Sequence, residues 1–166
     1  MSIALPYREA GEKKDLDALM ATLAPEVVFH SPLSARAGFH RRDEVRALFG
    51  VVFSVIDGLR YHTDVGDDRT RMLAATASLG ATTMEEAALL RFGDDGLITE
   101  ITMFVRPLPA LTRLMAALGP GLARAKGRNG LAALVGAATG PLVFMTESGD
   151  RTLVPLVTRA SRRRPQ

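Results

Sequence analysis

A predicted β-hairpin centred on Asp95 and Gly96 is the feature that most constrains the fold of this chain. This Asp-Gly pair lies between residues 82–92 and 97–106, where apolar and polar side chains alternate. An Asp-Gly pair in that setting is a strong signal for a tight turn joining two antiparallel strands. The chain is therefore expected to contain an antiparallel sheet with one face turned towards the core.

Hydrophobic periodicity and turn residues predict the other elements of the fold. Residues 43–56 form the clearest helix because their apolar side chains make one continuous stripe. Asp15 is a suitable N-cap for a shorter helix. The predicted elements are, in order, helices over 3–13 and from 15 to Pro25, a strand over 27–31, a loop over 32–41, a helix over 43–56, strands over 59–65, 71–79, 82–92 and 97–106, and a helix over 110–125. Alternation in the strand over 59–65 predicts Tyr61 on one face and His62 and Asp64 on the other.

Length and composition indicate one soluble globular domain. The chain has 166 residues, of which 47% are hydrophobic and 23% charged, and this length allows a substantial core. The absence of cysteine excludes disulfides, thiolate nucleophiles and cysteine-ligated metals. We identify no secretory signal and no apolar run approaching the roughly 18 residues of a membrane helix. These observations predict a cytoplasmic protein without a membrane partner.

The basic character of the chain is concentrated in its last eight residues. Arg159, Arg162, Arg163 and Arg164 lie there without any acid, and leaving them out changes the net charge from +3 to −1. The body is therefore close to neutral and carries no signature of a nucleic-acid-binding protein. The tail is interpreted as a solvated end, with binding to an acidic surface as the alternative.

Five short segments carry a resemblance to a known family. They are Asp15-Leu-Asp-Ala-Leu, Ala24-Pro-Glu-Val-Val-Phe, His30-Ser-Pro, Arg42-Asp-Glu-Val-Arg-Ala-Leu and Leu90-Arg-Phe-Gly-Asp-Asp-Gly-Leu-Ile-Thr-Glu. With these motifs, residues 3–115 resemble the nuclear-transport-factor-2-like superfamily, and within it the SnoaL-like, polyketide-cyclase-like group. The resemblance implies an α+β fold in which a cone-shaped, curved, mixed or antiparallel sheet is packed by N-terminal helices around a pocket. It divides the chain into a cone domain, residues 1–115, and a C-terminal extension, residues 116–166.

The resemblance leaves the chemistry open, because the superfamily holds isomerases, hydrolases, cyclases and binding modules. In ketosteroid isomerase, a similar pocket uses a tyrosine, a protonated aspartate and a basic aspartate. Aligned here, the tyrosine falls on Tyr7, the base on Ser31 and the protonated acid on Ala88. An acid of limonene-type epoxide hydrolases falls on Met103. The carboxylates of both enzyme types are therefore not retained.

Strand alternation predicts which side chains face the pocket. Glu85 and Glu86 are consecutive, so one must point inward, and we assign Glu86 to the pocket. A buried carboxyl group has a raised pKa, which suits a general acid or base. The alternatives are a solvated Glu86 or an internal ion pair with an arginine. With Tyr7 and Glu86 as candidate catalytic residues, the candidate ligand-binding residues are Phe29, Ser31, Phe49, Phe53, Tyr61, Met84, Ala88, Ile101, Met103 and Val105.

Two functions compete on this basis. The first is binding of a small hydrophobic or polycyclic molecule, with proton transfer on a carbonyl compound as in an isomerase or cyclase. The second is a non-catalytic ligand-binding or protein-interaction module of the same fold. No cofactor is predicted, and the three histidines share no metal-ligand spacing. Because members of the superfamily commonly pair through the outer face of the sheet, we expect a homodimer.

The extension differs in character from the cone. Glycines interrupt it, and we predict a short helix over 131–138 and a strand hairpin formed by 142–145 and 153–157. Many of its side chains are apolar and unsuited to water. We therefore expect residues 116–158 to dock as a lid or clasp on the open mouth of the cone or on a partner subunit.

Overall fold

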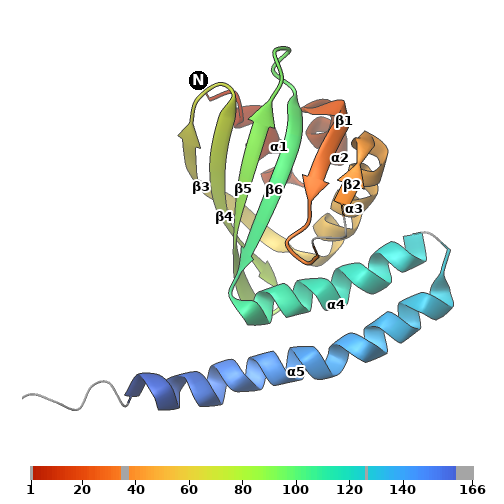
Figure 1. Ribbon diagram of the computed structural model, residues 1–166, viewed down its shortest axis with the longest axis vertical. Coiled ribbons are helices and arrows are strands. Elements are labelled where there is room, and N and C mark those ends of the chain that lie inside the picture. The colour runs from red at the N-terminus through yellow and green to blue at the C-terminus, as the bar shows by residue number, and fades with distance from the viewer. Residues whose placement is uncertain (1, 35–37, 126, 160–166) are drawn as a thin grey trace, which may run out of the picture. The chain divides into compact units, whose positions relative to one another are not determined.

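The computed structural model describes residues 2–34, 38–125 and 127–159. The chain divides into two compact units, with the boundary between Leu111 and Thr112 (Figure 1). The arginines predicted to form a basic tail, Arg162, Arg163 and Arg164, lie outside the described residues.

The first unit is a curved six-stranded sheet with three helices. Its elements are α1 (Leu5–Lys13), α2 (Leu16–Ala21), β1 (Leu23–His30), β2 (Gly38–His40), α3 (Arg41–Val55), β3 (Asp57–Gly66), β4 (Thr70–Leu79), β5 (Thr82–Phe92) and β6 (Ile98–Arg106). The strand order is β2-β1-β6-β5-β4-β3. Neighbouring strands are antiparallel except β1 and β6, which are parallel. This arrangement confirms the predicted α+β cone.

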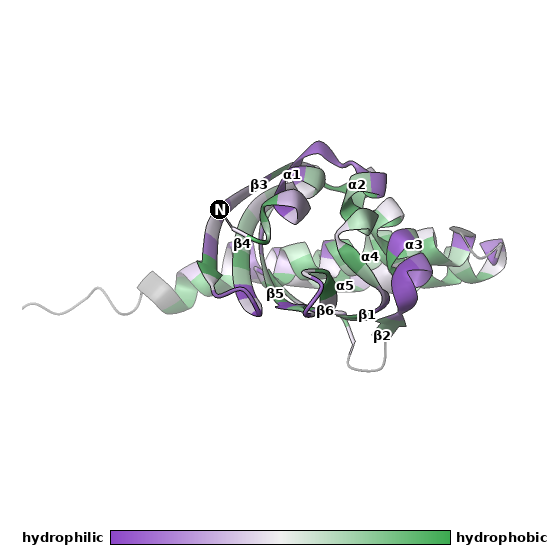
Figure 2. Ribbon diagram, turned by 90° about the horizontal axis from the view of Figure 1, so that it is seen from above, coloured by the Kyte–Doolittle hydropathy of each residue, from purple (hydrophilic) through white to green (hydrophobic). Residues whose placement is uncertain are grey.

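The helices cover the concave face of the sheet, as the view from above shows (Figure 2). Along β4, Leu73, Ala75, Ala77 and Leu79 are buried and the residues between them are not. This alternation is the expected pattern for a sheet with one covered face. The core therefore lies between the concave face and the helices.

Local interactions fix the end of α1 and the start of α2. The Asp15 carboxylate accepts a hydrogen bond from the Ala18 amide at 2.9 Å, which confirms it as the N-cap of α2. Lys14 ends α1 in the left-handed conformation, with φ of 54°. Its ammonium group donates to the Ile56 carbonyl at 2.5 Å and pairs with Asp57 at 2.9 Å. The end of α1 is thus joined to the start of β3.

Two boundaries near β1 differ from the sequence prediction. The strand begins at Leu23, whereas the sequence predicted residue 27 and a helix lasting to Pro25. The register of β1 against β6 shifts between Leu23 and Val28, so Pro25 lies where the ladder is interrupted and no amide donor is needed. Residues 38–40, predicted as loop, pair with β1 as the short edge strand β2.

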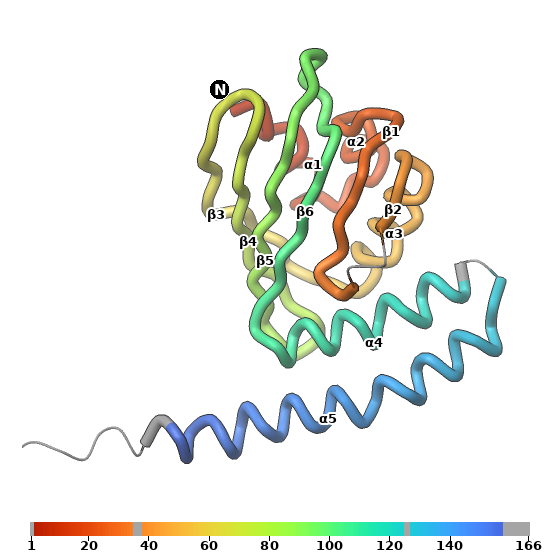
Figure 3. Tube along the Cα trace, viewed as in Figure 1, coloured from red at the N-terminus to blue at the C-terminus, as the bar shows by residue number. Residues whose placement is uncertain are grey.

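The second unit is a helical hairpin. It is built from α4 (Leu108–Ala125), whose first turn belongs to the cone unit, and α5 (Asn129–Arg159) (Figure 3). The predicted short helix over 131–138 and strand hairpin over 142–157 are wrong, because one helix runs through both. The Thr139, Thr146 and Thr152 hydroxyls donate to carbonyls three or four residues earlier. Such bonds satisfy hydroxyl groups within a helix, so threonine, glycine and proline here do not mark strand ends.

Leu90 provides a test of the core of the cone. Its side chain is fully buried in the centre of the sheet, between Arg71 on β4 and Ile101 on β6. Leu90→Ala should lower the free energy of unfolding by about 2–5 kcal/mol, because it leaves a cavity that the sheet cannot close. Val65→Ala, on an exposed side chain of β3, should change it by less than about 0.5 kcal/mol. Urea unfolding of both variants measures the difference, and equal losses would contradict this description of the core.

Candidate functional site

One row of residues crosses the concave face of the sheet and carries the candidate site. The backbone register pairs Tyr61 with Ala75, Ala75 with Glu86, and Glu86 with Val105. Two strand spacings, roughly 10 Å, separate the Cα atoms of Tyr61 and Glu86. Because the residue between them is alanine, nothing larger than a methyl group lies between the two polar side chains within this row.

Glu86 occupies an apolar part of this face. Its neighbours along β5 are Met84 and Ala88, each 1% exposed. None of the ion pairs formed by residues 2–34, 38–125 and 127–159 includes Glu86. Glu86 is half-buried, and this burial raises the pKa of its carboxyl group to about 7, because desolvation disfavours the charged form. The group can therefore gain or lose a proton near neutral pH.

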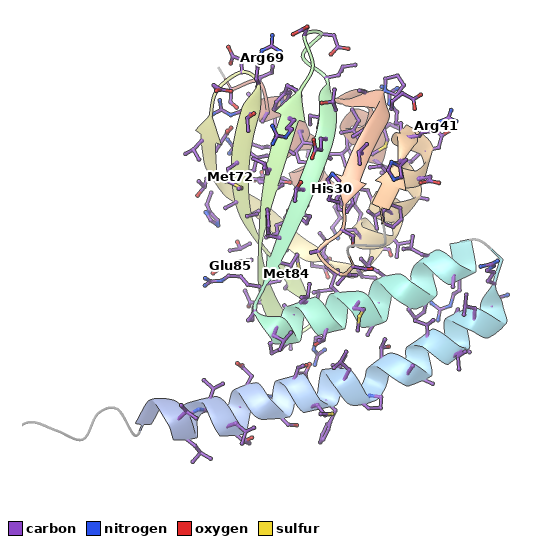
Figure 4. The ribbon with its side chains drawn as sticks, viewed as in Figure 1. His30, Arg41, Arg69, Met72, Met84 and Glu85 are labelled. Carbon is purple, nitrogen blue, oxygen red and sulfur yellow. The ribbon has the colours of Figure 1, made fainter. Side chains whose placement is uncertain are left out.

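The adjacent carboxylate behaves in the opposite way. Glu85 is next to Met84 on β5 (Figure 4) and lies on the outer face, where Arg106 contacts it at 2.8 Å. The Arg106 side chain of this pair is largely exposed and that of Glu85 is about half exposed. Two neighbouring glutamates thus differ in environment, and the inner one lacks a cationic partner among the described residues.

Helix α1 places a tyrosine over the same row. Tyr7 is buried, and its ring centroid lies 6.3 Å from that of Tyr61. Its hydroxyl is close to that of Tyr61, but the geometry does not meet that of a formed hydrogen bond, so Tyr7 Oη has no partner among the described residues. Burial, followed by the negative charge of Glu86, raises the pKa of Tyr7 well above its ordinary value. Tyr7 therefore stays protonated and can act as a hydrogen-bond donor.

Tyr61 is held by the helix that carries Tyr7. The Glu12 carboxylate accepts a hydrogen bond from the Tyr61 amide at 2.8 Å. A Cβ atom at Gly11 would lie 3.3 Å from the Tyr61 ring and hydroxyl, so the missing side chain admits the tyrosine. Burial, then Tyr7 and Glu86, raise the pKa of Tyr61 well above its ordinary value. Tyr7, Tyr61 and Glu86 thus form one electrostatically coupled group.

Two hollows lie beside this group. One of about 370 Å³ includes Tyr7 and lies against α1, α2 and the turn before β6; it is lined by Ile3, Pro6, Tyr7, Ala18, Ala21, Thr22, Phe92, Gly96, Leu97 and Ile98. The other, of about 210 Å³, includes Glu86 and Val105 and extends over the outer face; it is lined by His62, Ala74, Glu85, Glu86, Ala87, Phe104, Val105 and Arg106. The expectation that Tyr7 and Glu86 share one cavity bounded by Phe29, Ser31, Phe53 and Met103 remains a prediction.

The predicted aromatic wall is a packed cluster. Phe29 lies edge-on to Phe39 and Phe49, with ring centroids 6.0 and 5.9 Å apart, and Phe49 contacts Phe53 at 5.8 Å. Phe29, Phe49 and Phe53 are all buried. In this structure these rings pack against one another in aromatic contacts.

The remaining candidates lie on several strands. Ile101 and Met103 are buried on β6, and Val105 and Tyr61 are partly exposed. Ser31 follows β1, and its hydroxyl accepts a hydrogen bond from the Leu33 amide at 3.2 Å. No group of three metal-ligating side chains occurs within the described ranges.

An acidic group that alternation misplaced lies on the same concave face. The register of β3 against β4 shifts between Tyr61 and Thr63, which places Asp64 opposite the buried Leu73. Asp64 pairs with Arg71 at 2.5 Å and with Arg8 at 3.1 Å. Burial alone would raise the pKa of Asp64, but hydrogen bonds from Ser2, Arg71 and Arg8 outweigh it and lower the pKa. A β-bulge, which carries no distinctive residue here, causes the error.

Comparison with known proteins identifies the family. The family model of the SnoaL-like domain matches residues 6–101, more than half of the chain. The protein therefore belongs to the SnoaL-like family. The comparison with curated proteins gave no match.

Several solved structures have a fold similar to the cone of this chain. A bacterial protein with a cystatin-like fold from Silicibacter pomeroyi is 25% identical, with a TM-score of 0.66 over 70% of this chain and 82% of that one. A steroid delta-isomerase from Pseudomonas aeruginosa is 24% identical, with a TM-score of 0.64 over 75% and 89%. A candidate SnoaL-like polyketide cyclase from Shewanella denitrificans is 13% identical, with a TM-score of 0.53 over 63% and 88%. At such identities the last two likenesses show the fold alone.

Glu86→Gln should change how stability depends on pH. Because the pKa of Glu86 is raised from 4.5 to about 7 in the folded state, stability is highest below the unfolded pKa and declines as pH rises through the folded pKa. The substitution removes this decline and should raise the free energy of unfolding near pH 8 by about 1–3 kcal/mol, with little effect near pH 4.5. Urea unfolding at both pH values measures it, with Glu85→Gln as the matched control. Equal pH dependence in wild type and Glu86→Gln would show that Glu86 is not desolvated.

Proposed function

We propose that the cone binds a small hydrophobic or polycyclic molecule and catalyses proton transfer next to a carbonyl group. The observation that carries this proposal is the grouping of Glu86, with its raised pKa, and the two protonated tyrosines on an apolar face. Apolar pockets with a few convergent polar groups are the usual form of a small-molecule site.

The chemistry assigns one role to each polar group. The ionised Glu86 carboxylate would accept a proton from the carbon next to the carbonyl, and the electron pair of that C–H bond would move into an enolate. Tyr7 Oη, a buried donor without a partner among the described residues, would donate a hydrogen bond to the enolate oxygen. Glu86 would then return the proton to another carbon, which completes an isomerisation without net loss of atoms or charge.

The position of Glu86 supports this reading. In the resemblance to ketosteroid isomerase, the protonated acid falls on Ala88 and the base on Ser31. Glu86 lies on the same strand and the same face as Ala88, two residues away. The only carboxyl group in this row of residues would thus lie next to the position where the isomerase has an acid.

A second function, binding without chemistry, is favoured by the packing of the phenylalanines. Phe29, Phe49 and Phe53 contact one another, which leaves less room for a ligand on the β1 side of the cone. In that case the site would hold a ligand or an interaction partner, and the carboxyl group would serve only as a polar contact.

Kinetic variants separate the two functions. With a panel of β,γ-unsaturated cyclic ketones, including steroids, wild type should form the conjugated enone, with kcat/KM rising with pH through about 7. Glu86→Gln should lower kcat/KM by roughly 10²- to 10⁴-fold, and Tyr7→Phe by roughly 10- to 10³-fold. Glu85→Gln is the control and should keep full activity.

The outcomes are read by ultraviolet absorbance, with circular dichroism to confirm folding. Unchanged turnover in Glu86→Gln would exclude Glu86 as the base. Binding of the ketones without turnover, with equal affinity in wild type and Glu86→Gln, would favour the binding module.

We further propose a homodimer formed through the outer face of the sheet. The hollow of about 210 Å³ that extends over this face is lined in part by Ala74, Ala87 and Phe104, and Phe104 is 52% exposed. Phe104→Glu should convert a dimer to a monomer, because it places a charge in an apolar contact. Sedimentation velocity measures this, with Ala47→Glu, at an exposed position of α3, as the control. A wild-type protein that remains monomeric at all concentrations would rule the dimer out.

A further inference from the structure

The C-terminal helix α5 carries many exposed apolar side chains. Among the described residues, twelve large apolar side chains are exposed and nine of them lie on α5. Leu134 and Phe144 are 66% and 72% exposed. The nine residues are Leu131, Leu134, Leu142, Phe144, Met145, Leu153, Val154, Leu156 and Val157. Exposed apolar patches of this kind mark surfaces that bind an apolar partner.

The face of α5 that contacts α4 has the opposite character. A Cβ atom at Gly119 on α4 would lie 2.7 Å from Val135, and one at Gly136 would lie 3.6 Å from Pro120. Thr112 and Thr146 share a hydrogen bond of 2.8 Å between the helices. The Arg113–Glu147 ion pair also joins the two helices, just beyond the charge-free residues 129–146 of α5. Within that charge-free part, small residues and hydroxyl groups between helices, with large apolar residues outside, are the pattern of helices packed in lipid.

The length of the charge-free part of α5 also fits a membrane. By length and composition Asn129–Val157 is a helix that could cross a membrane, and residues 129–146 contain no Asp, Glu, Lys or Arg. A helix of this length measures about 27 Å, close to the roughly 30 Å hydrocarbon core of a bilayer. The sequence prediction required an unbroken apolar run and therefore overlooked this segment, whose glycines and threonines membrane helices tolerate.

Charge is divided unequally along the chain. Residues 101–166 contain ten basic and two acidic residues, a net charge of +8, whereas residues 1–100 contain eleven basic and sixteen acidic residues, a net charge of −5. Arg124 and Arg128 are exposed at the turn of the hairpin. Basic residues beside an apolar helix are attracted to anionic lipid headgroups. A nucleic acid would need a polar binding face, which α5 does not offer.

We propose that the helical hairpin of residues 112–159 binds an anionic lipid membrane. The exposed apolar face of α5 lies among the acyl chains, and Arg124 and Arg128 lie at the headgroups. This proposal replaces our expectation of a protein without a membrane partner. It is compatible with a cytoplasmic location, because the cytoplasmic leaflet carries anionic lipids.

Flotation of the full-length protein with vesicles tests the proposal. Wild type should float with vesicles that mix phosphatidylglycerol and phosphatidylcholine. The double variant Leu134→Glu/Phe144→Glu changes two exposed positions and should lower the bound fraction at least roughly tenfold, because it places two charges in the hydrocarbon region. Val65→Glu, at an apolar position of the cone that is also more than half exposed, is the matched control and should bind as wild type does.

A second variant tests the proposed contact of the two arginines with the lipid headgroups. Arg124→Gln/Arg128→Gln should weaken binding to the anionic vesicles on the order of tenfold and leave any binding to pure phosphatidylcholine unchanged. Added salt should weaken the wild type in the same direction. An equal effect of this variant on both kinds of vesicle would overturn the assignment of the arginines.

Three results would overturn the proposal as a whole. Wild type that fails to float with either vesicle shows that lipid is not the partner. If Leu134→Glu/Phe144→Glu floats normally but loses a lipid-free dimer in sedimentation velocity, α5 binds a second copy. If it floats normally but melts at a lower temperature with helix content intact, α5 covers the cone as a lid.

Discussion

The arrangement of the cone depends on the missing side chain at Gly11. At this position α1 lies against the ring and hydroxyl of Tyr61, where a Cβ atom would be only 3.3 Å away. The contact allows α1 to place Tyr7 over the row that carries Glu86. Ala75 lies between Tyr61 and Glu86 in that row, and its methyl side chain leaves space above the sheet between them. The polar group therefore arises from two small residues that leave space as much as from the residues that carry chemistry.

The concave face holds two carboxyl groups with opposite energetics. Asp64 receives Arg8 and Arg71, and its pKa is lowered despite its burial. Glu86 has apolar neighbours, and its pKa is raised to about 7. A charge that is partly withdrawn from water and lacks a partner destabilises a fold, and Glu86 is half-buried without a cationic partner among the described residues. This contrast within one face is the physical basis for giving Glu86, and not Asp64, the chemical role.

The sequence predicted those parts of the fold that local rules control. The Asp95-Gly96 turn and the alternation on both sides of it located β5 and β6 and placed Glu85 and Glu86 on opposite faces, and a small apolar run ended by Gly80 located β4. The shift in β3 was not predictable, because a bulge depends on pairing with β4 and no glycine or proline marks it. The continuous helix α5 was missed because its glycines and prolines resemble turn signals, while its threonine hydroxyls bond within the helix. The meeting of Tyr7, Tyr61 and Glu86 requires the packing of α1, which sequence spacing does not specify.

The bulge in β3 has a consequence for how this family can vary. Because side chains along a strand alternate with a period of two, removing one residue between Tyr61 and Asp64 would turn Asp64 to the outer face. Arg8 and Arg71 would then keep their positive charges on the concave face without the carboxylate that pairs them. The extra residue of the bulge and the three charged residues therefore depend on one another in this structure. Relatives that lack the extra residue should also lack at least one of the two arginines. Arg8 lies on α1, so a residue outside β3 should indicate in a sequence whether the bulge is present.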